Sequence, residues 1–97
     1  MAIQVIVGLQ AQPGRRDELA SVLERILGQL GPSAVGYLGS KRYVVIDNPD
    51  VLIEIAEWES AEARQVHMEE AAATGAYSPL TEVLSAPPRV TVITSLP

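Results

Sequence analysis

Apolar and polar residues alternate at both ends of the chain, as they do in half-buried β-strands. The first such segment covers residues 2–12, and the last covers residues 89–96. Residues 35–47 and 51–58 also read as strands, and residues 47–50, Asp-Asn-Pro-Asp, favour a turn that joins them as a hairpin. The pattern therefore predicts four strands.

Two other segments show the three- and four-residue spacing of amphipathic helices. The first carries apolar residues from Leu19 to Leu30 and is expected to stop at Gly31-Pro32. The second is predicted over residues 61–74 with Ser60 as its N-cap, and residues 78–84 can form a short helix after it. The order βαββαβ predicts an α+β, ferredoxin-like fold: a four-stranded antiparallel sheet with helices on one face, in a single domain of residues 1–97.

Helices on one face of such a sheet leave its other face without a cover. The third predicted strand is apolar on both sides, with Val51, Ile53 and Ile55 on one and Leu52, Ala56 and Trp58 on the other. Ile6 adds an apolar residue to the otherwise polar side of the first strand. Soluble monomers rarely leave a patch of this kind in water, so we expect a homodimer formed through the sheet face.

Composition narrows the classes of partner. The chain has seven basic and twelve acidic residues, which give a net charge of −5. This balance does not favour binding to the phosphates of nucleic acid. The absence of cysteine excludes disulfides and thiolate metal sites and is consistent with a reducing cytoplasm. No segment reads as a signal peptide or as a membrane helix, so we expect no membrane association.

An acid and the only tryptophan lie close together on the third strand. Glu54, Ala56 and Trp58 share one face by the two-residue period, which would place a carboxyl beside a large aromatic ring. Partial burial would raise the pKa of that carboxyl and make it a base suited to neutral pH. Alternatively, Glu54 pairs with Arg64 or faces solvent; if the faces are reversed, Ile55 and Glu57 point inward instead.

The only histidine, His67, is a second candidate base. It shares the small-residue face of its helix, which should look toward the sheet, although a lone histidine there is often a satisfied core residue. Tyr37 and Tyr43 are expected on one face of the second strand, and Tyr77 precedes the short helix. The candidate catalytic residues are thus Glu54 and His67, and those for substrate binding are Trp58, Arg64, Tyr37 and Tyr77. No cluster has metal-ligand spacing, so we expect no metal site.

Several short motifs together resemble the antibiotic biosynthesis monooxygenase (ABM) family. They are Pro32-Ser33-Ala34-Val35-Gly36-Tyr37, Asp47-Asn48-Pro49-Asp50, Glu57-Trp58-Glu59-Ser60-Ala61-Glu62-Ala63 with His67, and Leu84-Ser85-Ala86-Pro87-Pro88. The resemblance implies a dimeric α+β barrel with a pocket between sheet and helices in each subunit. Many members oxidise aromatic or quinol substrates with O2 and no metal or flavin, others degrade haem, and several have no known activity.

The chain departs from two groups within that family. Some quinone-forming members have Asn four residues before the Trp and Tyr six residues after it, where this chain has Glu54 and Arg64. The haem-degrading members resemble one another in an Asn, a Trp and a later His at the places of Val7, His67 and Tyr77. We therefore do not expect haem degradation.

Two functions of different classes remain open. The first is a cofactor-independent monooxygenase that oxidises a small aromatic or quinol substrate with O2, in a dry pocket that supplies a base and orientation. The second is a non-catalytic dimer that binds a small aromatic ligand or acts as an accessory protein. Polar groups left unpaired around empty space favour the first, and polar groups already paired to structural partners favour the second.

Overall fold

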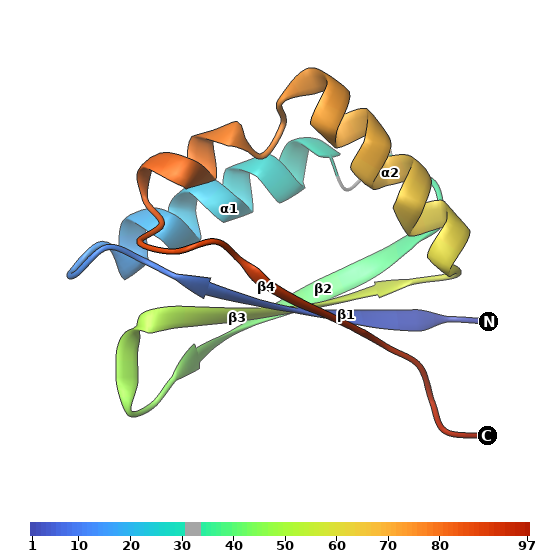
Figure 1. Ribbon diagram of the computed structural model, residues 1–97, viewed down its shortest axis with the longest axis horizontal. Coiled ribbons are helices and arrows are strands. Elements are labelled where there is room, and N and C mark those ends of the chain that lie inside the picture. The colour runs from blue at the N-terminus through green and yellow to red at the C-terminus, as the bar shows by residue number, and fades with distance from the viewer. Residues whose placement is uncertain (31–33) are drawn as a thin grey trace.

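The computed structural model describes residues 1–30 and 34–97, so the helix stop expected at Gly31-Pro32 lies outside the described residues. Its elements follow in the order β1 (Ile3–Gln10), α1 (Arg16–Leu30), β2 (Tyr37–Val45), β3 (Asn48–Trp58), α2 (Ala61–Thr74), the 3-10 helix η2 (Ser78–Glu82) and β4 (Arg89–Ile93). The sheet order is β2-β3-β1-β4, every neighbouring pair is antiparallel, and the helices cover one face (Figure 1). The ferredoxin-like prediction is confirmed.

The caps of α2 explain why this helix starts and stops where the sequence predicts. Ser60 Oγ accepts a hydrogen bond of 3.1 Å from the backbone N–H of Ala63. Gly75 ends the helix in the left-handed conformation, and its N–H points to the carbonyls of Ala71 and Ala72. These two caps fix the face that α2 presents to the sheet, which buries His67 and Ala71.

The hairpin turn lies one to three residues earlier than the sequence predicts. Ile46 and Asp47 form the turn, Val45 pairs with Asn48, and residues 48–50 belong to β3. A register irregularity between Val44 and Val45 accommodates Pro49, which cannot donate to the ladder. Asp50 extends the pairing of β3 with β1 by one step, because its backbone oxygen accepts from Ala11 N at 2.8 Å.

The expectation that Tyr37 and Tyr43 share a face is wrong. Tyr37 pairs with Trp58 but Gly39 pairs with Glu57, so one extra residue is inserted in β2 at this point. The β-bulge reverses the alternation, and Gly39 adopts φ 119°, which L side chains rarely do. Tyr37 consequently faces the helices, whereas Tyr43 lies on the opposite side of the sheet, beside Ile53.

Two groups of buried side chains separate the sheet from the helical layer. The larger lies around α1 and η2 and consists of Leu9, Ala11, Leu19, Leu23, Ile26, Leu52, Leu80 and Val83. The smaller consists of Ile3, Val5, Ala56 and Trp58. Val7 packs against both groups, and the space that they leave between sheet and helices is the site described below.

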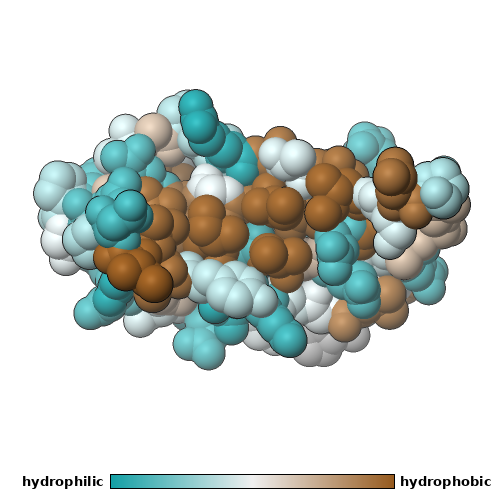
Figure 2. Space-filling model, turned by 90° about the horizontal axis from the view of Figure 1, so that it is seen from below, coloured by the Kyte–Doolittle hydropathy of each residue, from teal (hydrophilic) through white to brown (hydrophobic). Residues whose placement is uncertain are grey.

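The side of the sheet away from the helices is apolar along its middle (Figure 2). The strand registers place six apolar or aromatic residues on it, which we call the open sheet face: Ile6, Tyr43, Val51, Ile53, Ile55 and Ile93. Tyr43 is 48% exposed and Ile93 38% exposed. The prediction of a second apolar face is confirmed. Within the described residues, no helix has the length and apolar character needed to cross a membrane.

Candidate active site

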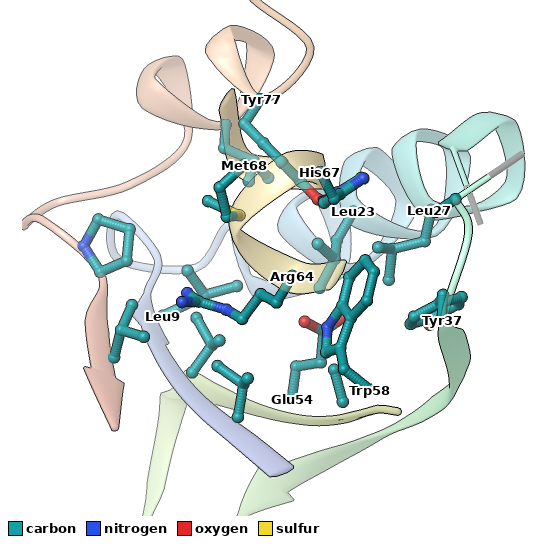
Figure 3. A pocket seen from close by; sticks show the side chains of 17 residues that line it. Leu9, Leu23, Leu27, Tyr37, Glu54, Trp58, Arg64, His67, Met68 and Tyr77 are labelled. Atoms are coloured by element: carbon teal, nitrogen blue, oxygen red, sulfur yellow. Dashed lines mark hydrogen bonds between the residues drawn. The ribbon is translucent and has the colours of Figure 1, made fainter. Parts of the chain in front are cut away.

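A pocket of about 220 Å³ lies between the helix-facing side of the sheet and helices α1 and α2 (Figure 3). Its wall is mainly apolar and includes Leu23 and Leu27 from α1, Met68 from α2, and Val90 from β4. The structure brings to this one pocket all six residues that the sequence nominates: Tyr37, Glu54, Trp58, Arg64, His67 and Tyr77. Its volume is below the roughly 300–1,000 Å³ of drug-sized ligand sites, so it suits a compact one- or two-ring molecule.

Glu54 projects into the pocket from β3, and only 8% of its surface is exposed. Its Oε2 atom is buried and has no hydrogen-bond partner among the described residues. Burial raises the pKa of the Glu54 carboxyl, and the positive charge of Arg42, its cross-strand neighbour in β2, opposes that shift. The carboxyl therefore holds a proton more readily than an exposed glutamate and can exchange it with a ligand.

The alternatives for Glu54 are decided by the strand register. Glu57 is exposed and Ile55 belongs to the open sheet face, so the reversed orientation of β3 does not occur. No ion pair joins Glu54 to Arg64 in residues 1–30 and 34–97. Figure 3 shows the guanidinium of Arg64 directed toward the side of Leu9, away from the Glu54 carboxyl.

Three aromatic rings form a continuous wall beside Glu54. The ring centroid of Trp58 lies 5.2 Å from that of Tyr37 and 5.0 Å from that of His67, with tilted planes in both pairs. The hydroxyl of Tyr37 donates a hydrogen bond of 2.8 Å to Ser40 Oγ, which fixes its ring. Such a wall can hold a flat aromatic ligand by offset or edge-on contact.

His67 is already paired to a structural partner. Its Nε2 atom lies 2.8 Å from the hydroxyl of Tyr77. Burial lowers the pKa of His67, which keeps the imidazole neutral at pH 7, and burial with the nearby Glu54 charge raises the pKa of Tyr77 to about 12. Of the two candidate bases, His67 is hydrogen-bonded within the fold, whereas Glu54 retains an oxygen for a ligand.

Sequence reasoning missed two polar residues that shape the site. Arg42 lies opposite Glu54, and Ser40 accepts the hydrogen bond from Tyr37. Both positions depend on the β-bulge near Gly39, which the alternation of residues does not reveal. Residues 1–30 and 34–97 contain no group of three His, Cys, Asp or Glu side chains that could hold a metal ion.

A close backbone approach fixes the turn before β2 against the start of α2, beside the pocket. Gly36 has φ 85°, and its carbonyl accepts from Glu59 N at 2.8 Å. A methyl group at Gly36 would lie 2.6 Å from Ala63 Cβ and 2.9 Å from Glu59 Cγ. Only glycine therefore permits this contact between the turn before β2 and the start of α2.

We expect Gly36→Ala to lower the free energy of unfolding by about 1–3 kcal/mol, because the added methyl forces the strand away from α2. Urea unfolding measures the change. Gly14→Ala is the matched control, since Gly14 also has a positive φ of 77° but nothing within 4 Å of the added methyl. If both variants lose the same free energy of unfolding, the effect is due to backbone strain, and the packing explanation is contradicted.

The sequence profile for antibiotic biosynthesis monooxygenases matches residues 2–77. The chain belongs to this family. Among curated proteins, no sequence matches the chain. The identification agrees with the position of Trp58 at the end of β3 and with the pocket between sheet and helices.

Several solved structures share the fold. A protein described as an antibiotic biosynthesis monooxygenase from Bordetella bronchiseptica superposes with TM-score 0.84 at 21% identity, covering 98% of this chain and 97% of that one. SnoaB from Streptomyces nogalater, a cofactor-independent oxygenase solved as the N63A mutant, gives TM-score 0.82 at 14% identity, covering 97% and 92%. Rv0793 from Mycobacterium tuberculosis gives 0.81 at 21% identity, covering 100% and 97%. At these identities the likeness establishes the fold.

Proposed function

We propose that the protein is a cofactor-independent monooxygenase that oxidises a small, electron-rich aromatic or quinol substrate with O2. The observation that carries the proposal is the buried, unpartnered Oε2 of Glu54, which faces an apolar pocket beside Trp58. A buried polar atom without a protein partner is costly to the fold, so its presence at the wall of a pocket is typical of a functional group. Membership of the ABM family supports the same reaction class.

The reaction can be written for a phenol that carries a hydrogen on the opposite ring carbon. The Glu54 carboxylate removes the phenolic proton, and the phenolate passes one electron to O2 to give an aryloxyl radical and superoxide. These combine at the opposite ring carbon, and the proton held by Glu54 completes a hydroperoxide. Loss of water, in which the ring hydrogen and the outer OH leave together, gives a quinone. The substrate gains one oxygen and loses two hydrogens, and Glu54 is regenerated.

The surrounding residues would orient the substrate and exclude water. The wall of Tyr37, Trp58 and His67 would hold the ring, and the apolar lining would keep the phenolate poorly solvated, which strengthens its interactions inside the pocket. The hydrogen bond between His67 and Tyr77 would keep this wall in place. We assign His67 and Tyr77 to positioning and Glu54 to proton transfer.

The experiment that tests the proposal is oxygen uptake by the purified protein with a panel of naphthols, polyphenols and hydroquinones. We expect uptake with at least one substrate and a product with one oxygen more and two hydrogens fewer, measured by mass spectrometry. Autoxidation is subtracted with protein-free samples. No protein-dependent uptake from any substrate that binds would favour the alternative, a non-catalytic pocket, for which the satisfied His67–Tyr77 pair is the supporting observation.

The proposal includes the absence of a resident cofactor. We expect the protein to purify colourless, without flavin, haem or stoichiometric transition metal, because the sequence lacks the ligand clusters and phosphate-binding glycine motifs of such groups. Absorbance spectra and elemental analysis measure this. A haem or flavin band that survives gel filtration would contradict the prediction, as would stoichiometric binding of added haem.

We also propose that two subunits associate through the open sheet face, because its central isoleucines would otherwise contact water. Each helical layer would then lie on the outside of the dimer. The cytoplasm is proposed as the location, since a chain without cysteine requires no oxidising compartment.

A further inference from the structure

Arg64 is a charged pocket residue that has no ion-pair partner among residues 1–30 and 34–97. It lines the pocket from α2 and is half-buried. The ion pairs found among residues 1–30 and 34–97 involve Arg15, Arg16 and Arg42, and none involves Arg64. A guanidinium is charged at every physiological pH and binds carboxylates through two parallel hydrogen bonds. Its place in a mainly apolar wall, with its guanidinium directed away from Glu54, therefore favours an anionic partner.

The charges around the pocket differ between its two sides. Glu54 projects from β3 below the aromatic wall, and in Figure 3 the Arg64 guanidinium reaches the other side, near Leu9. The positive charge of Arg64 lowers the pKa of Tyr77, whereas the negative charge of Glu54 raises it, so the two groups act on the same hydroxyl in opposite senses. A ligand lying between them meets an acid on one side and a cation on the other.

We propose that Arg64 selects aromatic substrates that carry a carboxylate or an equivalent anionic group. The anion would pair with the guanidinium, and the phenolic hydroxyl would then be turned toward Glu54. The protein carries a net charge of −5, which disfavours anionic ligands in general, so a preference for an anion requires a local cation of this kind. The inference names the substrate class of the proposed function and rests on it for the reaction, but the binding preference can be measured alone.

The test uses two-ring probes that differ in charge: 5-hydroxy-2-naphthoate, in which the carboxylate and the hydroxyl are on different rings, its neutral amide and 1-naphthol. Isothermal titration calorimetry gives the dissociation constants for the intact protein. Because a charge-assisted hydrogen bond contributes more than a neutral one, we expect the carboxylate to bind about 10- to 100-fold more tightly than 1-naphthol, with the amide close to 1-naphthol. The preference should weaken only modestly as salt is raised, because partly buried charge pairs are screened much less than exposed ones.

Arg64→Met should remove this preference, measured as the ratio of the dissociation constants of 1-naphthol and the carboxylate, and Arg64→Lys should retain part of it. Arg25→Met is the matched control, because Arg25 is exposed on α1 and its loss makes the same change in net charge. Circular dichroism establishes that each variant is folded. The wild-type preference should persist in Arg25→Met.

Three results would overturn the inference: equal binding of carboxylate and 1-naphthol, a preference that survives in Arg64→Met, or no binding of any probe by the folded protein. Oxygen uptake with the same probes separates this inference from the proposed function. A carboxylate preference that depends on Arg64 without oxygen uptake supports the inference and contradicts the monooxygenase. Turnover of 1-naphthol with no binding preference for the carboxylate supports the monooxygenase and contradicts the inference about Arg64.

Discussion

Glu54→Gln should lower the turnover of any accepted substrate by about 10²- to 10⁴-fold, the usual contribution of a positioned base. The amide has nearly the shape of the carboxyl but cannot accept a proton at neutral pH. Initial rates of oxygen uptake measure the loss. Glu57→Gln is the control, because the neighbouring Glu57 is exposed on the other side of β3, and we expect it to keep the wild-type rate. A wild-type rate in Glu54→Gln would show that another group is the base.

The pH dependence of the turnover rate should reflect the ionisation of the Glu54 carboxyl. Burial raises the pKa of Glu54 above its ordinary 4.5, and the active form is the carboxylate, so the rate should rise with pH through this raised pKa. The folded state also holds the proton more tightly than the unfolded chain. The stability that Glu54 contributes is therefore fully present below about pH 4.5 and is lost as pH rises through the folded-state pKa.

The Glu54→Gln variant should consequently have a lower turnover rate and a higher free energy of unfolding than the wild type. At pH 8 we expect its free energy of unfolding to be higher by about 1 kcal/mol, since a buried unpaired charge is removed. For a domain of this size that is a rise of roughly 4–8 °C in Tm. Loss of both activity and stability would instead indicate general damage to the fold.

Ile6→Lys should dissociate the proposed dimer. Ile6 lies at the centre of the open sheet face, paired with Ile55 of β3 and Thr91 of β4, so a charge there would be buried between two sheets. The core between sheet and helices does not contain this side chain, so the subunit should remain folded. Analytical ultracentrifugation at micromolar concentration should give twice the chain mass for the wild type and the chain mass for the variant.

Val66→Lys is the matched control for the dimer. Val66 is an apolar residue of α2 that is 54% exposed, and it belongs to the helical layer on the other side of the sheet. We expect this variant to remain dimeric despite the same change in charge. A wild-type protein that sediments as a monomer across the micromolar range would contradict the proposed assembly and leave the open sheet face to another partner.

The sequence was sufficient to predict that Glu54 and Trp58 share one face of their strand, because side chains alternate with a two-residue period. Which of the two faces points toward the helices was left open and required the structure. The sequence was also sufficient to predict the bounds of α2, since the helix begins after the N-cap Ser60 and ends at the glycine after Thr74. Together these elements placed Glu54, Trp58 and His67 in one pocket.

The other features of the site depend on how residues far apart in the sequence pair across neighbouring strands. The β-bulge near Gly39 turns Tyr37 inward and sets Arg42 opposite Glu54, and no local pattern reveals an inserted residue. The partner of His67 was equally hidden, because Tyr77 reaches it only through the turn that follows Gly75. The choice between Glu54 and His67 as the base therefore required the three-dimensional contacts.

The most direct test of the account is the fate of ¹⁸O2 during turnover by the purified protein treated with a chelator. We predict that the product of the best substrate in the panel gains one ¹⁸O atom from O2, with the other atom released as water, and that Glu54→Gln forms this labelled product at least about 100-fold more slowly. An unlabelled product, or labelling that is lost with chelation or is as fast in Glu54→Gln as in the wild type, would contradict the account.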